Sequence, residues 1–203
     1  MVKFLLAVLL VELTPGPNMA YLAALAFARG RGAGLIAVLG VALGLSVHAI
    51  VAALGAGELL LLYPWLYEGL RWIGIAYFLF LAWEGWQDAE DSPRGSDLKS
   101  TPGPLVLRGF MSNVLNPKSA LFFVSVVPTF VGLSPGHPDF RVQMAIFGLI
   151  YVGIATAVHA TIVMLAAQLS PWLLKGRRQT LVRRVLAVAL VLVAVWLIFA
   201  TRR

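Results

Sequence analysis

The sequence predicts an all-α integral membrane protein whose six transmembrane helices form two inverted repeats of three helices. The chain of 203 residues is 60% hydrophobic and only 12% charged, whereas soluble domains carry about 25% charged residues. Its mean hydropathy is +0.88. Six apolar stretches are each long enough to cross a bilayer. The first stretch of each half contains proline where a helix should lie in the middle of the membrane.

Each predicted span is an apolar run bounded by glycine, proline or charged residues. The six runs are Val2–Ala28, Leu35–Leu62, Gly69–Trp86, Leu105–Leu133, Phe140–Leu169 and Leu181–Ala200. They divide the chain into a first repeat (1–86), a polar cytoplasmic linker (87–104) and a second repeat (105–203). Because each repeat has an odd number of spans, the second enters the membrane in the opposite sense, as in many secondary transporters.

The first span is interrupted by the motif Thr14–Asn18, with the sequence TPGPN. Each proline lacks an N–H and clashes with the carbonyl four residues earlier, and glycine adds backbone freedom. Two half-helices should therefore meet here, and unpaired backbone at this depth is tolerated only against protein or a wet cavity. The fourth span has a matching break at Leu115–Lys118, with the sequence LNPK.

The two breaks offer both kinds of group that a zwitterionic amino acid needs. Half-helix N-termini suit a carboxylate, and carbonyls released by proline suit an ammonium group. Lys118 could attract a carboxylate or extend to the headgroups, while nearby asparagines could bind substrate or satisfy freed backbone groups, and Thr14 could bond its own preceding turn. The candidate substrate-binding residues are Thr14, Pro15, Gly16, Pro17, Asn18, Asn113, Asn116, Pro117 and Lys118.

Three more residues are candidates for proton coupling. Glu12 lies deep in the first span, where it could carry a proton or pair structurally with Lys118. His48 and His159 lie in the second span of each half, and histidine titrates near neutral pH, although a buried histidine can also serve packing. Both histidines stand in the same Val-His-Ala context, which is a trace of the internal repeat.

Other chemistries leave no pattern in the sequence. The absence of cysteine removes disulfides, thiol redox chemistry and thiolate metal sites. No nucleophile–base set, phosphate-binding loop or metal-ligand spacing is visible, so we expect no enzymatic activity, no cofactor and no bound metal. The net charge of +7 lies mostly between apolar runs, which favours lipid contacts over nucleic acid. The expected partners are a small amino acid and the lipid bilayer, and the sequence leaves open whether the chain forms a homodimer.

The motifs of both halves resemble those of the LysE/RhtB family of bacterial amino-acid exporters. The first half carries TPGPN at 14–18, RGRGAG at 29–34 and a Gly-x3-Gly-x3-His pattern at 40–48. The second half carries Gly-Phe at 109–110, then Asn-x2-Asn-Pro-Lys at 113–118 and Phe-Phe at 122–123. The resemblance implies export of amino acids or close derivatives, driven by a proton or ion gradient. The matching signature positions are Pro15, Gly16, Pro17, Asn18, Asn116, Pro117 and Lys118, whereas the roles of Glu12 and His159 rest on depth and chemistry alone.

These features predict a multi-pass secondary transporter of the bacterial inner membrane. We expect proton-coupled antiport, with the amino acid held near the midplane between the two broken helices. The alternative is a metal or inorganic-ion exporter on a similar scaffold, against which the few buried carboxylates and the lack of cysteine argue.

The orientation is predicted by the short loops, which carry ten Lys and Arg residues after spans 1, 3 and 5 and five on the other side. The positive-inside rule then places both termini outside and the 87–104 linker in the cytoplasm. Alkaline phosphatase fused to the C-terminus should therefore be active, and the same reporter inserted into the linker should be inactive. The reverse pattern would contradict the charge argument.

Overall fold

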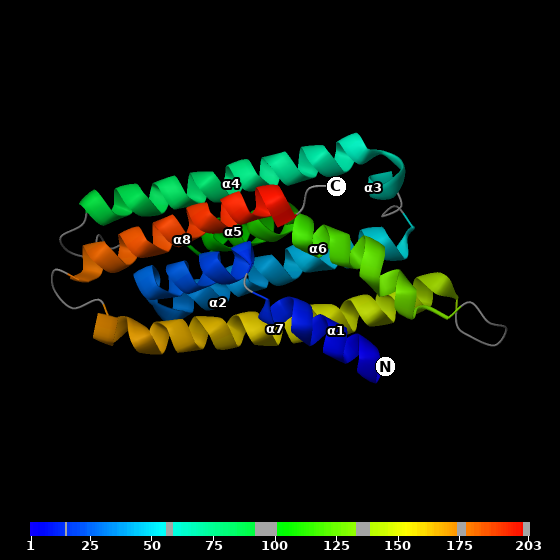
Figure 1. The fold of residues 1–203 in the computed structure, drawn as a ribbon. Coiled ribbons are helices and arrows are strands. Elements are labelled where there is room, and N and C mark those ends of the chain that lie inside the picture. The colour runs from blue at the N-terminus through cyan, green and yellow to red at the C-terminus, as the bar shows by residue number, and fades with distance from the viewer. Residues whose placement is uncertain (15, 56–58, 92–100, 133–138, 174–177, 201–203) are drawn as a thin grey trace.

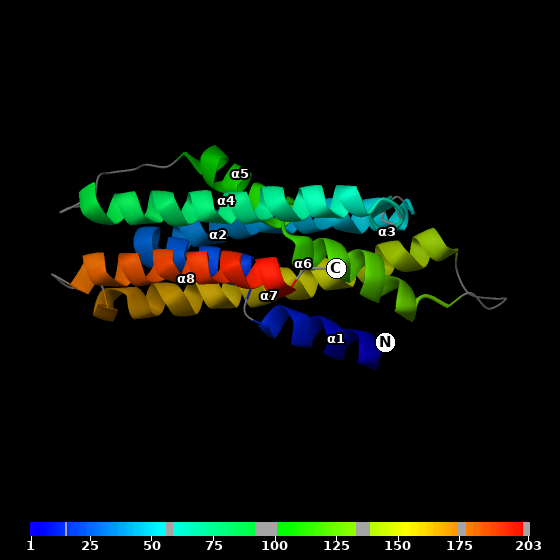
Figure 2. The ribbon, with the colours of Figure 1, turned by 45° about the horizontal axis from the view of Figure 1, so that its top comes forward.

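The computed structural model describes all residues except 15, 56–58, 92–100, 133–138, 174–177 and 201–203, and the described residues form helices without strands. The α-helices are α1 (Val2–Leu13), α2 (Pro17–Ala53), α3 (Leu59–Leu62), α4 (Pro64–Asp91), α5 (Pro102–Val114), α6 (Pro117–Leu121), α7 (Phe140–Leu173) and α8 (Arg178–Ala200). A π-helical turn, η2 (Phe122–Val126), and a 3-10 turn, η3 (Val127–Phe130), continue α6. The long helices lie side by side in one bundle, and α1 lies on its flank beside α7 (Figures 1 and 2).

The helix α2 reverses direction at Gly30. The φ angle of Gly30 is +80°, in the left-handed region that glycine adopts most easily. A Cβ built on Gly34 would lie 3.3 Å from the Cβ of Ala26, whereas eight residues of a straight helix rise by about 12 Å. Thus α2 consists of two legs, 17–29 and 31–53, joined by the basic turn between the first two predicted spans. The second leg packs along α7, where Gly34 faces Val163.

Several observed boundaries differ from the predicted spans. The second span was expected to continue to Leu62, but α2 ends at Ala53 because Gly55 adopts a φ of +79°, which terminates the helix. The stretch Leu59–Leu62 is a separate short helix. Next, α4 begins at Pro64 instead of Gly69, since proline is favoured at a first helical position, and it extends to Asp91 within the predicted linker.

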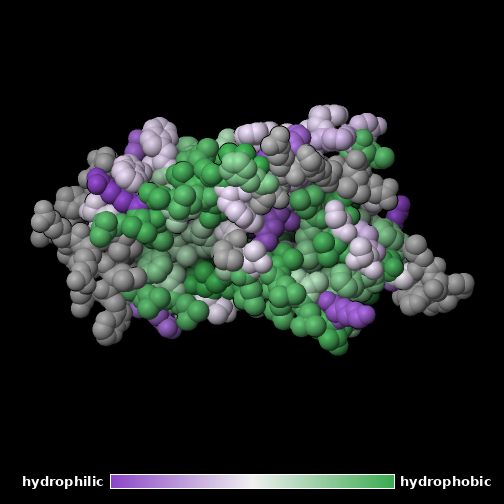
Figure 3. All heavy atoms as spheres, in the orientation of Figure 1, coloured by the Kyte–Doolittle hydropathy of each residue, from purple (hydrophilic) through white to green (hydrophobic). Residues whose placement is uncertain are grey.

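Many large apolar side chains lie on the surface of the structure. Large apolar side chains point outward on several helices, including Leu10 (69% exposed), Leu149 (72%) and Phe199 (71%). Figure 3 shows one face covered largely by apolar side chains along its length. Such extensive apolar exposure is unfavourable in water and fits a lipid environment.

By length and composition, Pro17–Ala53 and Phe140–Leu169 are apolar enough to cross a membrane. Because α2 reverses at Gly30, its legs 17–29 and 31–53 are two separate segments. A third candidate span is the pair Pro102–Val114 and Pro117–Phe130, bent by 51°, and Arg184–Phe199 is a shorter apolar segment. The all-helical prediction is confirmed. The arrangement of six spans in two inverted repeats stays a prediction.

The contact between α2 and α5 depends on glycine. A Cβ on Gly40 would lie 2.0 Å from the carbonyl oxygen of Val106, and a Cβ on Gly109 would lie 2.1 Å from that of Ala37. The two backbones are therefore in direct contact, as small residues allow in membrane helix pairs.

Replacing Gly109 with alanine should separate α2 from α5 and lower the midpoint of thermal unfolding of the detergent-solubilised protein. Overpacking of this kind costs about 1–3 kcal/mol, which corresponds to several degrees for a chain of this size. Gly153→Ala is the matched control, because a Cβ there meets no atom within 4 Å. Equal midpoints for the two variants would contradict the assigned close approach.

Candidate functional site

The first predicted break is confirmed. After Leu13 the chain leaves the helix, and Thr14 and Gly16 have extended backbone, with ψ of 119° and 174°. Pro15 lies outside the described residues. Because proline has no N–H, the carbonyl of Val11 loses the donor that a continuous helix would supply four residues later. The last turn of α1 therefore carries carbonyls without their normal helical partners.

The second predicted break is also confirmed, between α5 and α6. Leu115 and Asn116 separate the helices, and Pro117 occupies the first position of α6. The side chain of Asn116 caps α6, where its Oδ1 accepts a hydrogen bond from the Lys118 N–H at 3.0 Å. Glycine at position 74 lets α4 approach this break, because a Cβ there would lie 2.0 Å from the Leu115 carbonyl oxygen.

Lys118 joins the two breaks. Its Nζ donates hydrogen bonds to the carbonyl oxygens of Val11 at 2.6 Å and Thr14 at 2.8 Å. A cation at the C-terminal end of α1 is also stabilised by the negative end of the helix dipole. Lys118 thus finds backbone acceptors inside the protein, as an alternative to extending to the headgroups or pairing with Glu12.

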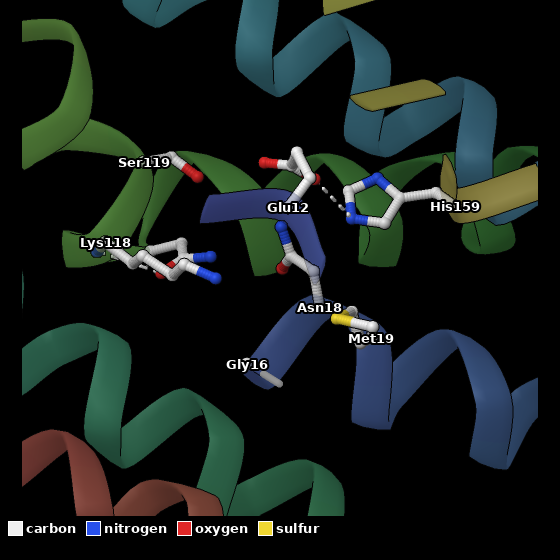
Figure 4. Close-up of a pocket in the computed structure, with 8 residues that line it drawn as sticks. Glu12, Gly16, Asn18, Met19, Lys118, Ser119 and His159 are labelled. Atoms are coloured by element: carbon white, nitrogen blue, oxygen red, sulfur yellow. Dashed lines mark hydrogen bonds and ion pairs between the residues drawn. The ribbon is translucent and has the colours of Figure 1, made fainter. Parts of the chain in front are cut away.

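A small polar cavity lies between the breaks (Figure 4). Its volume is about 10 Å³, which is room for about one water molecule. In Figure 4 the side chains of Glu12, Asn18 and Lys118 converge from three segments of the chain, and His159 approaches from α7. The lining residues are Glu12, Gly16, Asn18, Met19, Asn116, Lys118, Ser119 and His159.

Glu12 is held against α7. The buried residues of α1 recur every four positions, at Phe4, Val8 and Glu12, so the carboxylate lies on the helix face that packs against α7. The Tyr151 hydroxyl donates to Glu12 Oε1 at 2.5 Å, and His159 Nε2 lies 3.4 Å from Glu12 Oε2. A buried carboxylate needs such partners, because its removal from water is costly.

Two polar atoms at the cavity lack hydrogen-bond partners. They are Oδ1 of Asn18 and Nδ1 of His159. Asn18 is only 4% exposed. Unpaired buried polar atoms are uncommon and require an explanation, such as a ligand or a water molecule.

His48 and Asn113 lie together outside the cavity lining. His48 Nε2 is 3.2 Å from the carbonyl oxygen of Asn113, and its ring stacks on Phe123 with centroids 6.3 Å apart. Asn113 is fully buried, and its side-chain nitrogen and oxygen have no hydrogen-bond partner. The histidine of the first half therefore meets a neutral peptide group, whereas that of the second half meets a carboxylate.

The structure brings half of the twelve candidate residues to the cavity wall: Glu12, Gly16, Asn18, Asn116, Lys118 and His159. Thr14 contributes its carbonyl to Lys118, and its hydroxyl bonds the preceding turn at Leu10, as considered from the sequence. Pro17 and Pro117 begin the helices that follow the breaks.

Sequence reasoning missed three residues at the site, Met19, Ser119 and Tyr151. Tyr151 had a detectable signal, since it lies eight residues before His159 and hence on the same face of a helix.

The sequence matches the LysE type translocator family over residues 9–201. The chain belongs to this family. The homoserine/homoserine lactone efflux protein of Salmonella typhimurium is 27% identical to this LysE type translocator, over 87% of this chain and 84% of the relative. The threonine efflux protein of Escherichia coli K12 is 30% identical over 69% of each chain. A membrane protein of Pseudomonas aeruginosa is 28% identical over 86% of this chain and 83% of the relative. No solved structure gives a significant match.

The family match confirms the resemblance drawn from the paired motifs. Both breaks and every residue that lines the cavity lie within the matched region of this translocator.

Proposed function

We propose that the chain exports amino acids or close derivatives from the bacterial cytoplasm, by proton antiport, with the substrate held near the membrane midplane. One observation carries this proposal: unwound backbone from both broken helices meets at the same small polar cavity, and Lys118 joins the two breaks there. The names of the relatives, threonine and homoserine efflux proteins, favour a small polar amino acid as substrate.

The cavity offers complementary groups for a zwitterion. The Lys118 ammonium group and the N-terminal end of α2 at Asn18 suit the substrate carboxylate. The Glu12 carboxylate and the carbonyls at the end of α1 suit the substrate ammonium group. These opposite groups line one small space, so a single amino acid can contact both kinds once that space has widened.

We infer that the six spans form two inverted repeats, 1–86 and 105–203, with both termini outside. The contacts of the histidines support this arrangement, since each histidine approaches the last turn of the first half-helix in the opposite repeat. His159 faces Glu12 near the end of α1, and His48 faces Asn113 near the end of α5. The third long helices of the two halves, α4 and α8, also pack on each other. Exchanged contacts of this kind are expected for halves related by a two-fold axis.

The size of the cavity implies that transport requires movement. Room for about one water molecule is too small for an amino acid, so the cavity must widen before substrate binds. We propose that the two halves rock against each other about the breaks and open the cavity to one side of the membrane at a time.

We propose that the coupling proton is held by Glu12 and His159. Tyr151 and Asn18 face the pair from α7 and α2, and Lys118 faces it from α6. A proton from outside would neutralise Glu12 in the substrate-free protein. Release of this proton to the cytoplasm would restore the negative charge of Glu12, which attracts the ammonium group of the next substrate molecule. In each cycle one proton would enter the cell and one substrate molecule would leave.

Overexpression should raise extracellular threonine or homoserine in cells challenged with a panel of amino acids and analogues, and should protect them from toxic members of the panel. Lys118→Met should weaken the export of substrates that carry a carboxylate. Gly153→Ala should retain export, because a Cβ at position 153 meets no atom within 4 Å. Protection against divalent metals in the same panel, without amino-acid export, would contradict the proposal and favour the ion-exporter alternative.

The two histidines provide a matched test of proton coupling in proteoliposomes. His159→Gln should reduce export driven by a pH gradient roughly tenfold or more, a typical scale for the coupling of two ligands. His48→Gln should retain most of the gradient-driven export, because His48 lies outside the cavity lining and bonds a carbonyl. Equal loss in both variants, or retention in both, would contradict the assignment of the proton to the Glu12–His159 pair.

A further inference from the structure

We propose that the C-terminal end of α1 is a subsite for the primary ammonium group of the substrate, and that Lys118 occupies it when the substrate is absent. The substrate ammonium group displaces Lys118 Nζ from the carbonyls of Val11 and Thr14. This inference rests on the proposed function and specifies how that site recognises its ligand.

The subsite consists of hydrogen-bond acceptors. The carbonyl oxygens of Val11 and Thr14 already hold an ammonium group at 2.6 and 2.8 Å, which demonstrates that this geometry accepts one. A third acceptor, Oδ1 of Asn18, is buried without a partner and points toward the same space (Figure 4). A primary ammonium group has three N–H donors and no acceptor, so it can satisfy all three oxygens.

The charge of the surroundings favours a cation. The C-terminal end of α1 carries the negative end of its dipole, and the Glu12 carboxylate lines the same cavity. A hydroxyl group has no charge and only one O–H donor. It can therefore hydrogen-bond only one of these three acceptors at a time.

Lys118 is a tethered competitor for this subsite. Because it is part of the chain, its local concentration is high, and it keeps the released carbonyls bonded in the empty protein. After displacement it remains beside Gly16, within the same cavity, where its charge is available to a substrate carboxylate. Ammonium recognition thus comes first, and carboxylate recognition is a consequence of it.

The chemistry of the relatives' named substrates agrees with this order. Threonine, homoserine and homoserine lactone share a primary ammonium group, whereas the lactone has no free carboxylate. A site that depended first on the carboxylate would reject the lactone.

The subsite can be tested without transport by chemical rescue. Lys118→Ala removes the equivalent of propylammonium, so millimolar propylammonium should raise the thermal midpoint of the purified variant by about 2–4 °C, the shift expected for about 1 kcal/mol. It should leave wild type and Arg141→Ala, which loses a cation at the start of α7, unchanged. Tetramethylammonium, which has no N–H, should rescue nothing. An equal shift in all three proteins, no shift in Lys118→Ala, or rescue by tetramethylammonium would overturn the subsite.

Wild-type protein supplies a second test that does not depend on folding of the variant. Threonine and homoserine lactone should compete for export of labelled threonine at least tenfold more strongly than N-acetylthreonine, which keeps the carboxylate but has no ammonium group. Competition by N-acetylthreonine equal to that by the lactone would overturn the proposal. If labelled threonine is not exported at all, the proposed function fails for threonine, and the propylammonium experiment still decides the subsite.

Discussion

The structure depends on one constraint: peptide groups released from a helix inside an apolar environment must find partners. Proline in the first break takes the normal donor away from the carbonyl of Val11, and Lys118 from the second break supplies another. This bond requires the two breaks to lie together, although they are about a hundred residues apart in the sequence. The polar cavity is the space that remains where they meet.

His48 and His159 have the same flanking residues but different partners in the structure. His48 lies against a neutral carbonyl and an aromatic ring, which is a packing environment. His159 lies against Glu12, whose other oxygen accepts a hydrogen bond from Tyr151, so this histidine has a carboxylate as its neighbour. The same Val-His-Ala sequence thus occurs at two places in the chain, and of these two histidines it is His159 that lies beside a carboxylate.

Much of the candidate site could be predicted because proline acts locally. The breaks at Thr14–Asn18 and Leu115–Lys118 follow from the missing N–H groups and need no knowledge of the rest of the fold. Helix ends that depend on glycine were harder to predict from the sequence. Gly30 and Gly55 both adopt positive φ, but Gly30 reverses the chain within α2, whereas Gly55 lies where α2 ends. Glycine permits such a conformation without requiring it, so the neighbouring packing decides.

By itself the sequence determined the helical class, the apolar character and the position of both breaks, because these depend on composition and on the covalent structure of proline. Only the tertiary structure decided which groups meet. From the sequence, Glu12 could carry a proton or pair with Lys118, and the packing of α1 on α7 gave it Tyr151 and His159 as partners. His48 and His159 share the same flanking residues, yet helix register in three dimensions gives them different partners. Contact partners are determined by packing between distant segments, and that information is not contained in local pattern.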